Sequence, residues 1–237
     1  MRLNNRRETI LEASVRYFIK TGESITSERL FRHFDFGIKP AMIRWELNAL
    51  GDEHYFYQER LSGGRYPTNK AYRFLVDELM EEEVGDVFLK NFRLLFNEFI
   101  EGNKKAFVRE LADYLKMLSV GYDCESDYVY ESGLDELFGK LEIKTKDDLL
   151  QVVEDFENLS DRLTDGSEWW RGEKKWPQVF IGRSPFTKSE HLSIVASRLD
   201  SGNEEFLLIA IGPRRMDYQK SLRLFKTLNN LSTPSKK

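Results

Sequence analysis

The sequence predicts an α+β protein with a helical N-terminal part and a sheet in its last third. Apolar residues recur at helical spacing through the first 50 residues, a hairpin pattern follows at 55–67, and strand-like runs such as "QVFIG" and "EFLLIAIGP" come near the end. The 237 residues, of which 41% are hydrophobic, can build one large domain or two small ones.

Composition limits the classes of protein that the chain can belong to. No run approaches the roughly 18 consecutive apolar residues of a membrane span, and "MRLNNRRETI" lacks the apolar stretch of a signal peptide, so we expect a cytoplasmic protein without a membrane partner. The single Cys124 and three scattered histidines give neither a disulfide nor metal-ligand spacing. We therefore expect no metal and no cofactor.

Charge is distributed unevenly along the chain. The formal net charge of −4 argues against a protein that coats nucleic acid non-specifically. Residues 1–75 carry 13 Lys and Arg against 9 Asp and Glu, a balance of +4 that leaves −8 for the remainder. This asymmetry indicates a modestly basic N-terminal module on an acidic body, although many two-part proteins share it.

Three helices are predicted within the first 50 residues. The first covers residues 5–21 and ends at Gly22, and the second begins after a cap at Thr26 or Ser27. The third begins near Pro40, which the first helical position tolerates because that N–H has no intrahelical partner.

The third helix has two chemically different faces. Ile43, Leu47 and Leu50 form a narrow inward stripe, and the opposite face carries Ala41, Arg44, Trp45 and Asn48. A guanidinium, an amide and an aromatic ring beside a small residue suit base edges and phosphates, so these four residues are predicted to bind DNA, with Lys39 just before them. The alternative is an ordinary surface helix with an unusual tryptophan.

A hairpin pattern follows the third helix. Residues 55–60 alternate, the chain turns at Ser62-Gly63-Gly64, and it returns through Arg65 and Tyr66 until Pro67 stops the pairing. Three helices and a hairpin predict a winged helix-turn-helix, with Arg60 and Arg65 placed to contact phosphates or the minor groove. The glycines are equally explained by ordinary turn chemistry.

The middle of the chain is predicted to be helical. Residues 69–101 form one long helix or two helices broken near Gly85, and their phenylalanine stripe packs either on this chain or on a second copy in a dimer. Further helices are expected near 103–119, 128–140 and 146–163, with "SVGYDCESDY" as a polar break. Trp169, Trp170 and Trp176 either form a binding patch or anchor their loop on the core.

The last third predicts three strands, a tight turn at 201–203 and a closing helix over 216–230. Together these patterns divide the chain into a DNA-binding domain at 1–75, a helical linker and dimerisation region at 76–120, and a small α+β domain at 121–237. Asp217 and Tyr218 lack a base, nucleophile or metal set around them, so we expect a structural role there and no enzyme activity.

Two blocks of the sequence resemble the HrcA family of heat-inducible transcription repressors. The first comprises "YFIKTGESITSERL", "PAMIRWELNAL" and "SGGRYPTNKAYRFLVDEL", and the second runs from "VYESGLDELFGKLEIKTKDDLLQVVEDFENLSDRL" through "VFIG" to "IAIGPRRMDYQKSLRLF". The signature Gly-Pro-x-Arg-Met-Asp-Tyr lies at residues 212–218.

The resemblance implies a dimeric winged-helix repressor with a GAF-like body, which binds an inverted-repeat operator before chaperone genes and is maintained by the chaperonin. It assigns Arg44 to the recognition helix and Arg65 to the wing. This chain departs from the family at Trp45, where the family has asparagine, and at His54, where it has glycine. It is also shorter, and early GAF-like strands are expected to be missing between Ser119 and Tyr128, which leaves a reduced GAF-like domain.

These observations support two functions of different classes. The first is a sequence-specific repressor of heat-shock genes. The alternative is a diverged protein-interaction or stress-sensing module that uses its phenylalanine-rich helices and has lost specific operator binding. The acidic Glu46 and Glu59 near the third helix favour this alternative, and positive charge around Arg44 and Arg65 favours DNA.

Overall fold

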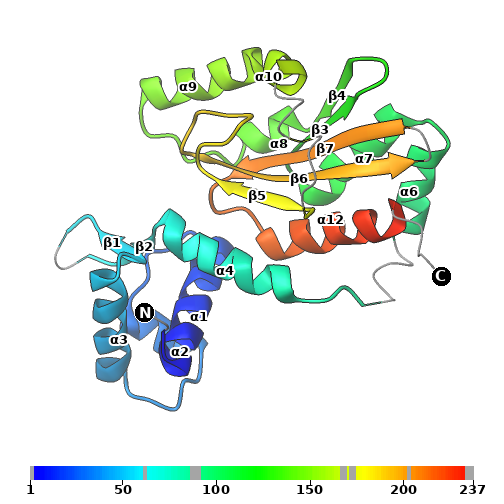
Figure 1. The fold of residues 1–237 in the computed structure, drawn as a ribbon. Coiled ribbons are helices and arrows are strands. Elements are labelled where there is room, and N and C mark those ends of the chain that lie inside the picture. Colours follow the sequence, from blue (N-terminus) through cyan, green and yellow to red (C-terminus); the bar gives the residue numbers. More distant parts are fainter. Residues whose placement is uncertain are drawn as a thin grey trace. The chain divides into compact units, whose positions relative to one another are not determined.

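The computed structural model describes residues 3–60, 63–85, 92–165, 170, 175–201 and 204–232. The chain divides into two compact units, Met1–Glu81 and Glu82–Lys237 (Figure 1). Among the described residues, no helix is long and apolar enough to cross a membrane.

Helices predicted from caps and periodicity build most of the first unit. α1 (Asn5–Thr21) ends at Gly22, whose φ of 69° lies in the left-handed region that glycine tolerates. The Thr26 side chain accepts a hydrogen bond from the Arg29 N–H and so caps α2 (Ser27–His33). α3 (Pro40–Asp52) begins with its proline at the first helical position.

A two-stranded antiparallel sheet follows α3. β1 (Phe56–Gln58) pairs with β2 (Arg65–Pro67), so Pro67 is the last paired residue opposite Phe56. An extra bridge joins Arg65 to Ile25, which lies between α1 and α2. His54, where the family has glycine, adopts a φ of 62° at the turn before β1, a conformation in which glycine has no steric cost.

The first unit has a core of its own. The inner sides of α1, α2, α3 and α4 (Asn69–Glu81) contribute completely buried side chains, among them Ile10, Leu11, Leu30, Ile43, Leu47 and Leu50. Burying each such side chain contributes about 1.5–3 kcal/mol. The three buried residues of α3 are those that the helical spacing predicted.

The second unit is built on a five-stranded antiparallel sheet with the strand order β4-β3-β7-β6-β5. Its strands are β3 (Leu118–Asp123), β4 (Tyr128–Ser132), β5 (Gln178–Ile181), β6 (Leu192–Ser201) and β7 (Glu204–Pro213). The long central pair β6 and β7 is in register from Leu192 opposite Pro213 to Ser201 opposite Glu204.

Helices cover both faces of this sheet (Figure 1). One face packs on α8 (Leu134–Phe138), α9 (Lys146–Glu157) and α10 (Leu159–Asp165), and its core includes Val120, Tyr122 and Trp170. The other face packs on α6 (Arg93–Ile100), α7 (Lys104–Leu115) and α12 (Tyr218–Ser232). The predicted α+β class is confirmed, and this body fits the GAF-like domain that the resemblance implies.

One prediction between residues 116 and 140 is wrong in part and another is mostly wrong. Residues 119–123 of the expected polar break belong to β3, all six residues of which are buried, and only residues 124–127 form a turn. Most of the helix expected near 128–140 is β4 followed by the short α8. The reason is that Ser119 and Asp123 are polar residues on a buried strand, so the apolar alternation that identifies a strand is hidden.

The aromatic residues of the middle region pack inside the second unit. Phe92, Phe96 and Phe99 are buried, and the Phe99 ring contacts the rings of Phe107 and Phe206. The intrachain alternative for this stripe is therefore confirmed for the described residues. Trp170 is also completely buried, as an anchor would be, whereas Trp169 and the turn at 202–203 lie outside the described residues.

Candidate nucleic-acid interface

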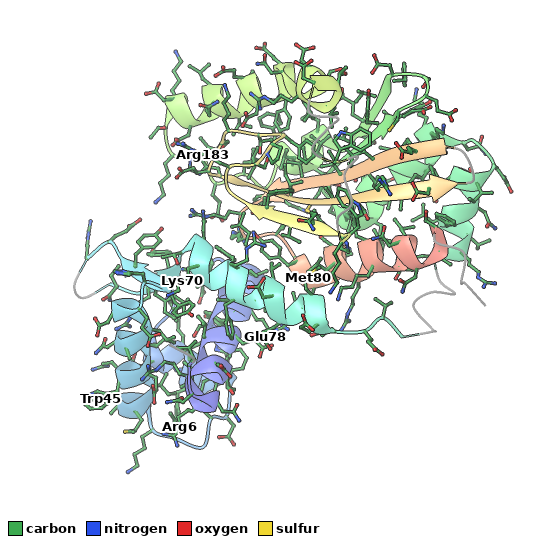
Figure 2. All side chains as sticks on the ribbon, viewed as in Figure 1. Arg6, Trp45, Lys70, Glu78, Met80 and Arg183 are labelled. Carbon is green, nitrogen blue, oxygen red and sulfur yellow. The ribbon has the colours of Figure 1, made fainter. Side chains whose placement is uncertain are left out.

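The outer face of α3 carries four of the seven predicted DNA-binding residues. All four are exposed, because the opposite stripe of the helix is buried in the core: they are Ala41, Arg44, Trp45 and Asn48. Trp45 is 77% exposed, and Figure 2 shows it on the outer side of α3. An exposed tryptophan beside an arginine is unusual for a surface that only meets water.

Arg44 is paired with a carboxylate of the preceding helix. Its Nη2 donates to Glu28 Oε1 at 2.8 Å, and both side chains are more than half exposed. The pKa of Glu28 lies below its ordinary value because of a hydrogen bond from its own backbone N–H, aided by Ser27 and Arg44. Water screens this exposed pair, so Arg44 can exchange Glu28 for another acceptor at small cost.

Asn48 and Arg65 connect α3 to the hairpin. Arg65 Nη2 donates to Asn48 Oδ1 at 2.5 Å. The two residues line a hollow of about 400 Å³ between the helix and the strands, together with Gly51, Asp52, Phe56 and Gln58. Burial, and secondarily the charge of Arg44, places the pKa of Arg65 below its ordinary value.

The other predicted residues flank this surface. Lys39 is exposed and caps α3 through its backbone carbonyl, which accepts hydrogen bonds from Met42 and Ile43. Arg60 is exposed after β1, and its carbonyl accepts a hydrogen bond from the Gly63 N–H. The structure thus brings Asn48 and Arg65 into direct contact and shows no contact of Lys39 or Arg60 with them.

The acid closest to this face in sequence points elsewhere. Glu46 accepts a hydrogen bond from Arg7 Nε at 3.0 Å, and Arg7 also donates to Glu53 at 2.7 Å. These bonds join α1 to α3, so the carboxylate of Glu46 is neutralised on the inner side of the helix.

Sequence reasoning missed two residues of this region, Glu28 and Ile25. Glu28 lies in the first turn of α2, where an acid is explained by the helix dipole, so nothing in the sequence indicated its pairing with Arg44. Ile25 bridges to Arg65 through two backbone hydrogen bonds of 2.8 and 2.9 Å. A single isolated bridge leaves no periodic signal in the sequence.

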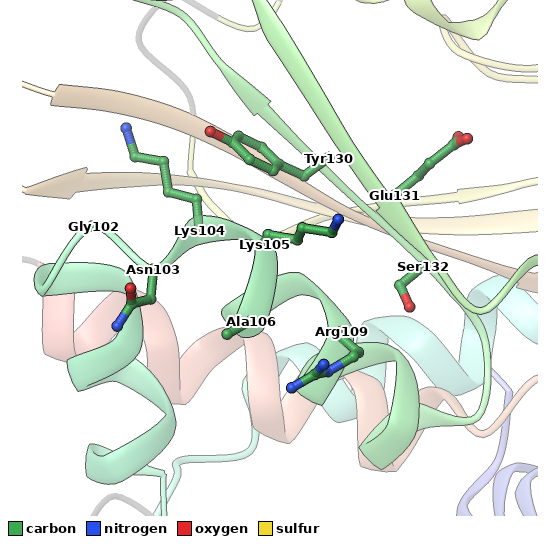
Figure 3. A pocket seen from close by; sticks show the side chains of 9 residues that line it. All are labelled: Gly102, Asn103, Lys104, Lys105, Ala106, Arg109, Tyr130, Glu131 and Ser132. Atoms are coloured by element: carbon green, nitrogen blue, oxygen red, sulfur yellow. The ribbon is translucent and has the colours of Figure 1, made fainter.

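The second unit has a hollow of its own, with a volume of about 460 Å³ (Figure 3). Residues from the start of α7 and from β4 line it, including Lys105, Arg109, Tyr130 and Ser132. Lys104 and Glu131 also line it, and Figure 3 shows their side chains pointing away from Arg109. No cluster of His, Cys, Asp and Glu able to hold a metal occurs among the described residues.

Asp217 and Tyr218 have structural contacts. Asp217 Oδ1 accepts a hydrogen bond from the Lys220 N–H at 2.9 Å at the start of α12. The Tyr218 hydroxyl lies 2.6 Å from the Arg214 carbonyl and 2.8 Å from Ser193 Oγ. This part of the Gly-Pro-x-Arg-Met-Asp-Tyr signature therefore fixes the last helix against the sheet.

Comparison with known proteins gives consistent matches. Residues 68–222 match the family model "HrcA protein C terminal domain". The heat-inducible transcription repressor HrcA of Natranaerobius thermophilus is 33% identical over 126 residues, which are 50% of this chain and 36% of that protein. The HrcA of Lachnoclostridium phytofermentans is 37% identical over 87 residues, which are 37% of this chain. The HrcA of Desulforudis audaxviator is 41% identical over 83 residues, which are 35% of this chain.

These matches span a quarter to about a third of the relatives' own length, 25% and 24% in the last two cases. A crystal structure of a hypothetical protein shares the fold, with a TM-score of 0.75, 17% identity and 98% coverage of both chains. The family model covers more than half of the sequence, and on that ground the chain belongs to the HrcA family.

Proposed function

We propose that this protein is a sequence-specific DNA-binding repressor of heat-shock genes. The observation that carries the proposal is the outer face of α3, where Arg44, Trp45 and Asn48 are exposed beside Arg65 of the hairpin. Membership of a family whose relatives are named heat-inducible transcription repressors supplies the regulatory role.

The first unit supports this function as a winged helix-turn-helix. In this interpretation α2 and α3 form the helix-turn-helix, α3 is the recognition helix, and β1 and β2 form the wing. A helix of 13 residues with a polar outer face can enter the major groove, which is about 12 Å wide. Lys39, directly before α3, and Arg60, which follows β1 in the hairpin, would contact the phosphate backbone.

The proposed operator is an inverted repeat bound by a homodimer. A two-fold dimer presents two copies of α3 to half-sites one helical turn apart or a multiple of it. Chaperonin is a further proposed partner, on the basis of the family resemblance. The second unit would then act as the GAF-like body. Within the proposed region at 76–120, the residues between α4 and α6 would be the linker, and the outer sides of α6 and α7 would contribute to dimerisation.

The alternative of a protein-interaction module loses its main support. It relied on the phenylalanine-rich helices to bind another protein, whereas Phe92, Phe96 and Phe99 are buried within the second unit. The acid Glu46, which also favoured it, is paired with Arg7. The positive side chains of Arg44 and Arg65 remain on the proposed DNA-binding face.

Selection of duplexes from a random pool by the full chain tests the proposal. We expect enrichment of an inverted repeat that differs from the operator of relatives, because Trp45 cannot make the hydrogen bonds of asparagine. The Trp45→Asn variant should select a different sequence from the same pool. A wild-type chain that enriches no sequence at physiological salt would contradict the proposal.

A further inference from the structure

The wing arginine has contacts that a phosphate-binding residue does not need. Arg65 is half-buried, its guanidinium donates to Asn48 Oδ1 at 2.5 Å, and it lies in the hollow between α3 and the strands. Phosphates lie outside the grooves, so a side chain that contacts them is best placed at an exposed edge. Arg65 instead contacts Asn48 of α3.

The backbone fixes the position from which this side chain starts. Arg65 pairs with Gln58 in the hairpin and exchanges two hydrogen bonds with Ile25. A Cβ on the neighbouring Gly64 would lie 2.2 Å from Ser24 Oγ, so the chain is tightly packed there. Arg65 is therefore a rigid part of the sheet, which suits a residue that orients another side chain.

We propose that Arg65 is a positioning residue that orients Asn48 for base recognition and does not itself bind phosphate, an inference that rests on the proposed function. Because Arg65 donates to Asn48 Oδ1, it fixes which side of the amide carries the oxygen, and the two N–H donors on the other side are available to face the groove. The guanidinium of Arg44 likewise offers only donors.

This donor-rich face defines the bases that it can recognise. Guanine presents two acceptors in the major groove, O6 and N7, whereas cytosine presents a donor at N4. Burial, and secondarily the charge of Arg44, lowers the pKa of Arg65, and an acceptor atom between the two guanidinium groups would relieve their repulsion. The half-site should therefore contain a guanine opposite the pair Asn48 and Arg44.

The test measures affinity for the selected duplex, for duplexes with single base-pair changes and for one with 7-deazaguanine, across a range of salt concentrations. Arg65→Ala, Arg65→Lys and Asn48→Ala are compared with Arg60→Ala, which removes an exposed wing arginine. Circular dichroism and urea unfolding establish that each variant folds. Asn48→Ala acts on the same contact without changing the hairpin.

We expect both Arg65 variants and Asn48→Ala to lose discrimination at the same guanine, by about 5- to 150-fold. The double variant Arg65→Ala/Asn48→Ala should lose no more than either single variant. The salt slope should stay at the wild-type value for these variants and fall by about 0.9 for Arg60→Ala, which would lose one phosphate contact.

Different results would contradict the role of Arg65 and the proposed function. This inference alone would be overturned if the wild-type chain binds selectively but Arg65→Ala lowers the salt slope by about 0.9 and Arg65→Lys keeps the wild-type base preference. It would also be overturned if Asn48→Ala and Arg65→Ala change the base preference at different base pairs. A wild-type chain without selective binding would overturn the proposed function and this inference together.

Discussion

Two charged sites, one in each unit, are built in contrasting ways. In the second unit, Asp155 is completely buried and accepts hydrogen bonds from Arg162 and from the backbone of Lys188 and Ser189. In the first unit, Arg44 is exposed and held by one exposed glutamate. Buried charges with several partners fix a fold, whereas an exposed charge with one replaceable partner is available for binding.

The largest expected effect is the loss of Asp155. Asp155→Ala should lower the free energy of unfolding of the second unit by about 3–5 kcal/mol, because the Arg162 cation and two backbone N–H groups lose their acceptor. Urea unfolding measures this change. The control is Asp161→Ala, an exposed acid of α10, which should change stability by less than about 0.5 kcal/mol. Equal effects of the two variants would show that burial does not distinguish them.

The pair Lys104 and Asp123 should come next. Lys104 Nζ lies 2.9 Å from Asp123 Oδ2 and both residues are buried, so Lys104→Met should cost about 3 kcal/mol. The neighbouring Lys105→Met, on an exposed side chain of the same helix, is the matched control. An equal loss of stability in both variants would contradict the claim that the buried pair of Lys104 and Asp123 stabilises the second unit.

The same pair predicts a pH dependence. Burial alone would raise the pKa of Asp123, but hydrogen bonds from Lys104, Ser126 and the Glu125 N–H outweigh it, and the pKa is lowered. A lowered folded-state pKa stabilises the protein above the unfolded value, about 3.9, and this contribution disappears as the pH falls through the folded value. Asp123→Asn should therefore lose less unfolding free energy than wild type as the pH falls from about 6 to about 2, measured by urea titrations at several pH values in this range. Identical pH profiles for wild type and variant would contradict the account.

A smaller effect is expected where the hairpin meets the first helices. Gly64→Ala should cost about 1–3 kcal/mol, because the added Cβ would lie 2.2 Å from Ser24 Oγ. It should also weaken DNA binding, because the wing would shift. Gly85→Ala, at an exposed position with no atom within 4 Å of the added Cβ, should leave both quantities unchanged.

The smallest predicted effect concerns Glu28. Glu28→Gln should leave stability nearly unchanged and raise affinity for the selected duplex a few fold, because Arg44 no longer exchanges a carboxylate for DNA and a negative charge near phosphates is removed. Fluorescence anisotropy at two salt concentrations measures the change. A lower affinity would indicate that Glu28 orients Arg44 for binding.

The two units also differ in how much of their secondary structure the sequence predicts. α1, α2 and α3 follow from local signals, namely the caps at Thr26 and Gly22, Pro40 and the 3.6-residue spacing of apolar residues. β3 could not be recognised because its polar Asp123 is neutralised by Lys104, 19 residues earlier. Contacts between distant residues of this kind leave no local pattern.

The candidate interface shows the same division. The exposure of Arg44, Trp45 and Asn48 follows from the position of the core stripe on α3, so the sequence alone predicted that they share one face. The contact between Arg65 and Asn48 depends on how the hairpin packs against the helix, through the bridge to Ile25 and the close approach of Gly64 to Ser24. That packing is a property of the tertiary structure.

The most direct test of the central claim compares Arg44→Ala with Arg183→Ala. Arg183 is an exposed arginine of the second unit, paired with Glu190 at 3.3 Å as Arg44 is paired with Glu28, so both variants remove the same charge from a similar environment (Figure 2). At fixed salt, Arg44→Ala should lose roughly 1–3 kcal/mol of affinity for the selected duplex, and Arg183→Ala should bind like wild type. Equal affinities for the two variants would contradict the claim that the outer face of α3 binds DNA.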